Sequence, residues 1–246
     1  MEETGREFME NTRFQCLGRS DQSLGYPYPP LEKGYDEENI LIDLPDPAQT
    51  NVNDVSLKEA IEKRSSIRKY SREPLSIEEL SYLLWCTQGV KKVIHNAATF
   101  RTVPSAGARH ALETYILANN VEGLEKGVYR FLPIEHKLLA IKIDSDIGRS
   151  ITAACLDQEF VKENAVTFIW TALAYRMTYR YGQRGYRYLH LDAGHVCQNL
   201  YLSALSIDCG VCAIAAFMDD EMNDILGIDG KEEFTIYVAT LGKQLL

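Results

Sequence analysis

The sequence predicts an α+β protein in which helices flank a central mixed or antiparallel sheet. Apolar residues make up 46% and charged residues 25% of the 246 residues, as in an ordinary globular protein. Strand-like and helix-like segments interleave without the regular βαβ rhythm of a parallel sheet. Residues 165–173 are β-branched and aromatic on both faces, which is typical of a central strand. The length allows one large domain or two small ones.

The first 54 residues differ from the rest and predict an extended arm. Prolines at positions 27, 29, 30, 45 and 47 block long helices and central strands. Four aliphatic side chains are expected to pin the arm to a surface: Ile40, Leu41, Ile42 and Leu44. We therefore expect an arm at residues 1–54 and a folded domain at residues 55–246.

Two capping boxes predict the first helices of that domain. Ser56 is followed by Glu59 before an apolar stretch, and Ser76 is followed by Glu79. Apolar residues then recur at helical spacing until Gly89.

The later elements follow from hydrophobic periodicity and β-propensity. We predict strands at residues 113–119, 127–132, 136–143, 165–173 and 234–241. We predict helices at residues 147–155, after 157, at 189–207 and at 219–226. The helix at 189–207 is apolar on nearly every side, so we expect it to be deeply buried.

The charge balance excludes several classes of partner. The net charge is −9, from 26 basic and 35 acidic residues, which disfavours nucleic acid and anionic membranes. No apolar run approaches the ~18–20 residues that cross a bilayer, and the N-terminus has no secretory signal pattern. We expect a cytoplasmic protein with reduced cysteines.

The segment from Arg64 to Tyr70 is the richest candidate site. It follows the first predicted helix and carries Arg64 and Arg68 with two hydroxyls, Ser65 and Ser66, between them. Guanidinium groups match phosphate and polar ring edges, so the segment could bind both. The alternative is a charged helix end that complements the helix dipole.

Two further segments could approach a ligand closely. The run Pro104-Ser105-Ala106-Gly107 combines small residues with backbone N–H donors, although it could equally be an ordinary turn. Lys243 follows a glycine at the end of the last predicted strand, where a lysine suits a phosphate. On its own this is a weak signal.

Two patterns suggest chemistry but favour a structural interpretation. Cys209 and Cys212 have Cys-x-x-Cys spacing, yet they follow a helix and no further zinc ligands have matching spacing. Small buried residues in a tight turn explain them better, so we predict no metal. Asp192 and His195 could suggest a relay, but they lie among apolar helical residues and lack a third group.

Basic and aromatic residues interleave over residues 175–188. Such a pattern can stack on single-stranded nucleic acid, but the acidic chain argues against it. We interpret the segment as the rim of a cleft for an aromatic or anionic small molecule. The rim candidates are Arg180, Tyr181 and Arg184.

These segments, in this order, resemble the nitroreductase family of FMN-dependent oxidoreductases, closest to the SagB-type dehydrogenases. The resemblance covers roughly residues 55–246, and its most specific parts are PSAGARH and YGQRGYRYLHLDAGH. It implies an α+β sandwich that forms an intertwined homodimer, with two FMN sites at the interface. Both subunits would contribute to each site.

The resemblance also implies roles for particular residues. Arg64 would contact the FMN phosphate, Ser65 and Ser66 the phosphate–ribityl region, and Arg68 the flavin edge that becomes anionic on reduction. The partner's copies of Pro104, Ser105, Ala106 and Gly107 would line the flavin. Lys243 would close the phosphate site. The other face would be lined by Ala213, Ile214, Ala215 and Ala216.

The implied function is electron transfer from NAD(P)H through FMN to a small organic acceptor. An alternative is a SagB-like dehydrogenase that oxidises a modified peptide. Such enzymes use a basic side chain and a neighbouring tyrosine of their own. The position of that base holds Arg180, which is a poor base because arginine stays protonated. A flavin-consuming enzyme of the BluB type and a non-catalytic flavin- or metal-binding module are also compatible with these residues.

Overall fold

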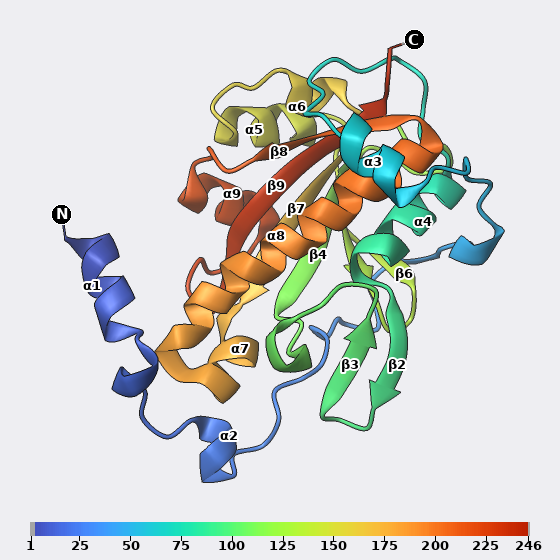
Figure 1. Cartoon of the computed structure of the whole chain (residues 1–246). Coiled ribbons are helices and arrows are strands. Elements are labelled where there is room, and N and C mark those ends of the chain that lie inside the picture. Colours follow the sequence, from blue (N-terminus) through green and yellow to red (C-terminus); the bar gives the residue numbers. More distant parts are fainter. Residues whose placement is uncertain (1–2, 246) are drawn as a thin grey trace.

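The computed structural model describes residues 3–245, which fold around a seven-stranded sheet (Figure 1). The strand order is β1-β6-β5-β4-β7-β9-β8, and each neighbouring pair is antiparallel, so the sheet is antiparallel rather than mixed. A separate hairpin is formed by β2 (Val90–Ile94) and β3 (Ala98–Arg101). The strands of the large sheet are β1 (Leu41–Asp43), β4 (Leu112–Ala118), β5 (Gly127–Leu132), β6 (Lys137–Ile143), β7 (Val166–Leu173), β8 (Cys209–Ile214) and β9 (Glu233–Lys243).

Helices cover both faces of the sheet, which confirms the α+β class. One face packs against α4 and α8 and the other against α5, α6 and α9, so each face has its own apolar core. In Figure 1, α8 crosses the front of the sheet from α7 to α3. None of the described helices is long and apolar enough to cross a membrane. The helices are α1 (Thr4–Asn11), α2 (Asp21–Leu24), α3 (Leu57–Lys63), α4 (Ile77–Gln88), α5 (Ile147–Ala154), α6 (Phe160–Glu163), α7 (Ala174–Tyr181), α8 (Gly185–Ala204) and α9 (Asp219–Leu226).

Local signals located several of these elements well. Both bonds of the capping box between Ser76 and Glu79 open α4, which ends at Gly89 as predicted. At the start of α3, the Ser56 hydroxyl accepts the Glu59 N–H at 3.2 Å. The predicted strands at 127–132 and 136–143 pair as β5 and β6.

Three expectations about single segments were wrong. The cysteine segment forms edge strand β8 instead of a tight turn, because it pairs along its whole length with β9. Helix α8 is not buried on every side, since Leu191 is 59% exposed on an open face. Ile40 does not pin the arm, because it is 66% exposed.

The arm is anchored in the sheet more deeply than an appendage would be. Its β1 extends the sheet beside β6, and Ile42 and Leu44 pack against the core. Upstream, the Lys33 ammonium lies 2.5 Å from Glu233, and Arg130 donates to the Lys33 and Gly34 carbonyls at 3.0 and 2.8 Å. Glu233 and Arg130 are buried, so this part of the arm adds partners to a polar network in which Tyr115 and Thr171 already donate to Glu233.

Candidate functional site

A surface strip beside β8 brings two of the predicted segments together. Residues 64–68 leave the end of α3 and run parallel to β8, where Ser66 forms a bridge with Val211. The Ile67 N–H donates to the Val211 carbonyl at 2.9 Å. The strip therefore passes next to residues 213–216, which end β8 and continue into an exposed turn.

Tyr201 on α8 joins the members of this strip. Its ring centre lies 5.3 Å from the Arg64 guanidinium carbon. Its hydroxyl lies 3.1 Å from Ser66 Oγ and accepts the Ala213 N–H at 2.9 Å. The sequence prediction missed Tyr201, since one tyrosine in an apolar helix gives no sign of what it meets across the fold.

The strip carries positive charge without an internal counter-charge. Among residues 3–245, neither Arg64 nor Arg68 forms an ion pair, whereas the preceding Lys63 pairs with Glu59 at 2.6 Å. Ser65 is exposed beside Arg64. Two unpaired guanidinium groups with exposed hydroxyls fit an anion such as a phosphate.

Lys243 has a different environment from Arg64. Its ammonium lies 2.5 Å from Glu79 and donates to the Ile207 carbonyl at 2.9 Å. Burial is the largest single effect on the pKa of Lys243 and lowers it, but the hydrogen bond to Glu79 and the nearby negative charges together raise this pKa above its ordinary value. The adjoining hollow, of about 540 Å³, is also lined by Glu73 and Glu122. A phosphate would have to compete with carboxylates here.

The loop at residues 104–107 is held from the buried side by Asp192 on α8. The Asp192 carboxylate accepts the Ala106 N–H at 3.2 Å, and the Ser105 hydroxyl accepts the His110 N–H at 2.9 Å. Burial raises the pKa of Asp192, while the hydrogen bonds from Ser105 and Ala106 oppose that shift. Asp192 thus holds the loop at residues 104–107 in place from α8.

The other side of the loop touches the rim candidates. Gly107 has φ +59°, and a Cβ at this position would lie 2.5 Å from Tyr181 Oη and 3.0 Å from Arg180 Cδ. Glycine is required here both by the backbone conformation and by the close approach of α7. Arg180 and Tyr181 therefore lie against the loop, as members of one site would.

Arg184 faces a different surface. Its guanidinium donates to the Thr12 carbonyl and the Tyr188 hydroxyl, both at 2.8 Å. Arg187 next to it also donates to the Thr12 hydroxyl, at 2.7 Å. The basic segment thus holds the arm at this point, and no open cleft edge is formed by Arg184.

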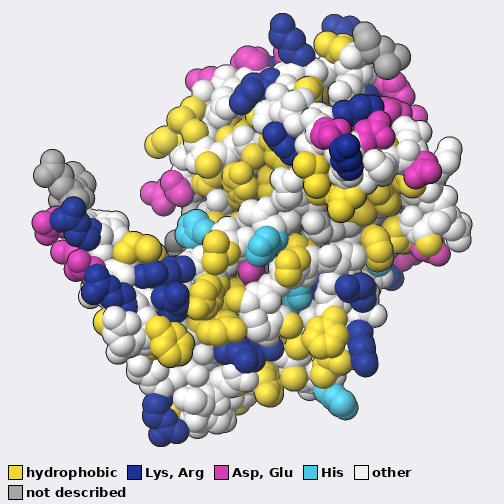
Figure 2. All heavy atoms as spheres, in the orientation of Figure 1, with side chains coloured by type: hydrophobic (Ala, Val, Ile, Leu, Met, Phe, Trp, Pro, Cys, Tyr) yellow, Lys and Arg dark blue, Asp and Glu magenta, His cyan; other side chains and the backbone are white. Residues whose placement is uncertain are grey.

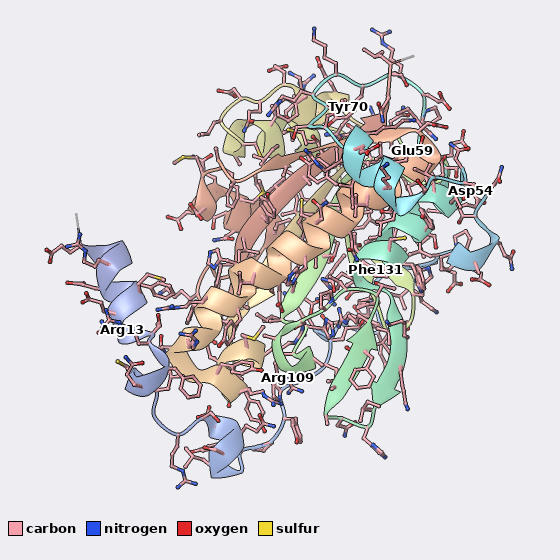
Figure 3. The ribbon with its side chains drawn as sticks, in the orientation of Figure 1. Arg13, Asp54, Glu59, Tyr70, Arg109 and Phe131 are labelled. Carbon is pink, nitrogen blue, oxygen red and sulfur yellow. The ribbon has the colours of Figure 1, made fainter. Side chains whose placement is uncertain are left out.

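Apart from Arg184 and Lys243, the predicted site residues fall into two groups, one beside the C-terminal end of α8 and the other along its N-terminal half. Tyr201 and Asp192 are nine residues apart on this helix, which corresponds to about 14 Å. In Figure 3, the labelled Tyr70 marks the α3 end of α8 and the labelled Arg109 marks the α7 end. We call the first group the Arg64 end (residues 64–68, Tyr201 and residues 213–216) and the second the Ser105 end (residues 104–107, Arg180, Tyr181 and Asp192).

The cysteine pair has the environment of core residues. Cys209 and Cys212 are 0% and 1% exposed, and neither forms a disulfide. Burial raises the pKa of Cys209 to about 12 and also raises that of Cys212, which disfavours the reactive thiolate. Within residues 3–245, no group of three or more His, Cys, Asp or Glu side chains is placed to hold a metal ion.

The fold and the order of these segments define a family. The chain belongs to the nitroreductase family, whose family model matches residues 61–243. A Methanocaldococcus jannaschii protein named as a nitroreductase is 36% identical over 208 residues, 85% of this chain and 98% of that protein. The trifolitoxin-processing protein TfxB of Rhizobium leguminosarum bv. trifolii is 31% identical over 140 residues, 55% of this chain and 32% of its own. The expected kinship with nitroreductases and SagB-like proteins is confirmed.

Solved structures confirm the nitroreductase fold. A nitroreductase-named protein from Anabaena variabilis superposes with a TM-score of 0.73 at 29% identity. The match covers 98% of this chain and 47% of that one, so this chain spans about half the length of that relative. A Desulfovibrio desulfuricans structure, described as a nitroreductase in complex with FMN, has a TM-score of 0.56 at 15% identity and covers 79% of this chain and 89% of its own.

Proposed function

We propose that the protein is an FMN-dependent oxidoreductase that passes electrons from NAD(P)H to a small organic acceptor. The observation that carries this proposal is the Arg64 end, where two arginines without ion pairs lie beside serine hydroxyls in a nitroreductase-family chain of net charge −9. The FMN bound in a fold neighbour supports the choice of cofactor. FMN, when bound, supplies the two-electron transfer between donor and acceptor.

In this proposal, the Arg64 end binds the phosphate half of the cofactor. Arg64, Ser65 and Ser66 hold the phosphate and the adjoining chain, and Arg68 provides positive charge near the ring edge. Tyr201 keeps Arg64 and Ser66 in position, because it contacts both. The turn at residues 213–216 borders the ring. Lys243 contributes only when its ammonium exchanges Glu79 for the phosphate.

The Ser105 end would complete the site of a second copy. One α8 separates the two ends, so a two-fold dimer offers a way to bring the Arg64 end of one chain to the Ser105 end of its partner. Apolar side chains exposed on α3 and α8 support this arrangement: Leu57, Ile61 and Leu191 are 67%, 56% and 59% exposed. Figure 2 shows hydrophobic side chains gathered over α8 on this face. Such surfaces are typical of subunit interfaces.

A second candidate is a dehydrogenase that acts on a modified peptide. The likeness to the trifolitoxin-processing protein favours it, although this chain covers about a third of that relative. Arg180 at the position of the expected base weighs against it, because a guanidinium does not accept a proton near neutral pH.

The visible absorption spectrum of the purified full chain, followed by anaerobic addition of NADPH, tests the proposal. We expect a flavin spectrum that bleaches with NADPH. A flavin spectrum that NADPH does not bleach would favour the peptide dehydrogenase over the NAD(P)H-dependent enzyme. A colourless protein that cannot be loaded with FMN would contradict both candidates.

A further inference from the structure

Arg180 differs from the other three arginines of residues 175–188 in that its side chain is not bonded to the described part of the fold. Arg176 is buried and paired with Glu113 at 2.6 Å. Arg184 and Arg187 bind the arm at Thr12. Within residues 3–245, Arg180 makes no ion pair or hydrogen bond, and its guanidinium carbon lies 5.6 Å from the Tyr181 ring. Three arginines of this segment are thus used by the fold, and the fourth is exposed beside the Gly107 loop.

A second arginine without an ion pair stands next to Arg180. Arg109 donates to the Gly107 carbonyl at 3.1 Å and to the Ala97 carbonyl at 2.7 Å, which fixes its guanidinium at the loop. Burial lowers the pKa of Arg109, and the charge of Arg180 lowers it further. Like charges repel each other, and an anion bound between or over the two guanidinium groups would relieve this repulsion.

Aromatic rings surround this pair of charges. The Arg109 guanidinium carbon lies 6.0 Å from the ring centre of Tyr28, which the arm brings to the loop. Tyr181 packs edge-to-face on Tyr188 with ring centres 4.8 Å apart. In Figure 2, basic side chains lie among hydrophobic ones over the lower part of this face, where acidic side chains are sparse. Such a surface suits a planar ring that bears a carboxylate or phosphate.

We propose that Arg109 and Arg180 form an anion-binding pair that selects a ligand with a carboxylate or phosphate group at the Ser105 end. This rests on the proposed function, because it assigns the chemical class of the molecule that reacts at the same site. Arg180 makes the direct contact, since its guanidinium forms no hydrogen bond or ion pair with any residue that the structure describes and has only the Tyr181 ring beside it. Arg109 holds the loop and adds to the local field. The anionic group belongs either to an aromatic acceptor or to the 2′-phosphate of NADPH.

Titration of the FMN-loaded full chain with unreactive probes tests the pair. Benzoate and the neutral benzyl alcohol represent the acceptor, NADP⁺ and NAD⁺ represent the donor, and the shift of the flavin absorption bands reports binding. We expect the anionic member of at least one probe pair to lose about tenfold in affinity in Arg180→Gln, as for one charge-assisted bond. The neutral probe should be unchanged, and Arg180→Lys should retain most of the preference.

A matched control removes a different surface charge. Arg149→Gln deletes an exposed arginine of α5 that pairs with Asp146 at 3.5 Å, and it should change no probe affinity. A loss confined to benzoate identifies the acceptor as the source of the anion, and a loss confined to NADP⁺ identifies the donor. If Arg180→Gln and the parent chain bind all four probes with equal affinity, Arg109 and Arg180 do not form an anion-binding pair. A chain that takes up no FMN fails the proposed function instead, and calorimetric titration with benzoate still tests Arg180.

Discussion

The two ends of α8 reach a binding surface by different means. At the Arg64 end, the backbone of residues 64–68 lies along β8, and the arginine side chains remain free of carboxylates. At the Ser105 end, the chain turns through positive φ at Gly107, Ala108 and His110, with values of 59°, 53° and 43°. Contact with strand β8 thus positions charge at one end, and a strained loop provides a close-fitting surface at the other.

This difference shows where the stability of each end originates. A non-glycine residue at positive φ costs about 1–2 kcal/mol, so the loop needs compensation from elsewhere. The hydrogen bonds that Ala106 donates to Asp192 and His110 donates to Ser105 supply it. The Arg64 end needs no such support, and we expect its substitutions to change ligand affinity more than stability.

The largest effect is expected from Arg64→Ala. Removing a charge-assisted contact to a phosphate costs about 2–3 kcal/mol, so FMN affinity should fall about 30- to 150-fold. The free energy of unfolding in urea should fall by less than about 1 kcal/mol, because Arg64 forms no ion pair within residues 3–245 and loses only its contact with the Tyr201 ring. FMN fluorescence quenching and urea unfolding measure the two quantities. A large loss of stability with unchanged FMN affinity would reverse the assignment of the Arg64 end.

The next effect belongs to the Ser105 end and depends on pH. Burial, together with the charge of Arg101, lowers the pKa of His110 from 6.5 to about 3. The folded state therefore keeps His110 neutral where the unfolded chain binds a proton. The contribution of neutral His110 to the free energy of unfolding is complete above pH 6.5. It is lost as the pH falls from 6.5 toward the folded-state pKa of about 3, and the loss is about 2 kcal/mol at pH 5.

His110→Gln should remove most of this dependence. Urea unfolding at about pH 7.5 and about pH 5 should show a loss of stability on acidification that is about 2 kcal/mol smaller than in the parent chain. An equal loss in both proteins would mean that other groups dominate the acid response of the loop.

A smaller effect is expected from Gly107→Ala. The positive φ and the approach of Tyr181 Oη to 2.5 Å both penalise a Cβ, so stability should fall by about 1–2 kcal/mol. FMN affinity should fall with it, because the loop shifts. Gly123→Ala is a matched control with φ +80° and open space around the position, so it isolates the backbone penalty. Equal losses of stability in the two variants would show that contact with Tyr181 adds no steric cost.

The smallest effect on the cofactor is expected from Lys243→Gln. Since Glu79 already holds its ammonium at 2.5 Å, FMN affinity should fall less than about fivefold, well below the loss for Arg64→Ala. The same fluorescence titration compares the two variants directly. A loss as large as that of Arg64→Ala would place Lys243 directly on the phosphate.

Local patterns in the sequence predicted much of the fold. The Ser76 capping box, the β5–β6 hairpin and α9 depend on neighbouring residues, and their predictions were close. Strand β8 was missed because its small residues show no alternation, and only pairing with β9 makes it a strand. Helix α7 was hidden because its arginine and tyrosine side chains, Arg176 and Tyr179, bond to the arm far away in sequence.

In the candidate site, too, local features could be predicted from the sequence and long-range contacts could not. Residue types and order in the sequence singled out the segments that form both ends, because arginine–serine and small-residue patterns are local. The contacts that organise them are long-range: Tyr201 with Ala213, Asp192 with Ala106. A charged Asp192 within an apolar helix was a visible signal of a buried partner, but its identity depended on the tertiary fold.

The central claim is that the Arg64 end of one chain and the Ser105 end of another form one FMN site. Co-expression of Arg64→Ala and Gly107→Ala chains with different tags allows the mixed pair to be isolated. Its FMN content is then compared with that of each variant alone. If the two ends of different chains meet, the mixed pair regains one intact site, about half the parent content, while each variant alone stays depleted. A mixed pair as depleted as its parents would contradict the claim, because both ends would then act within a single chain.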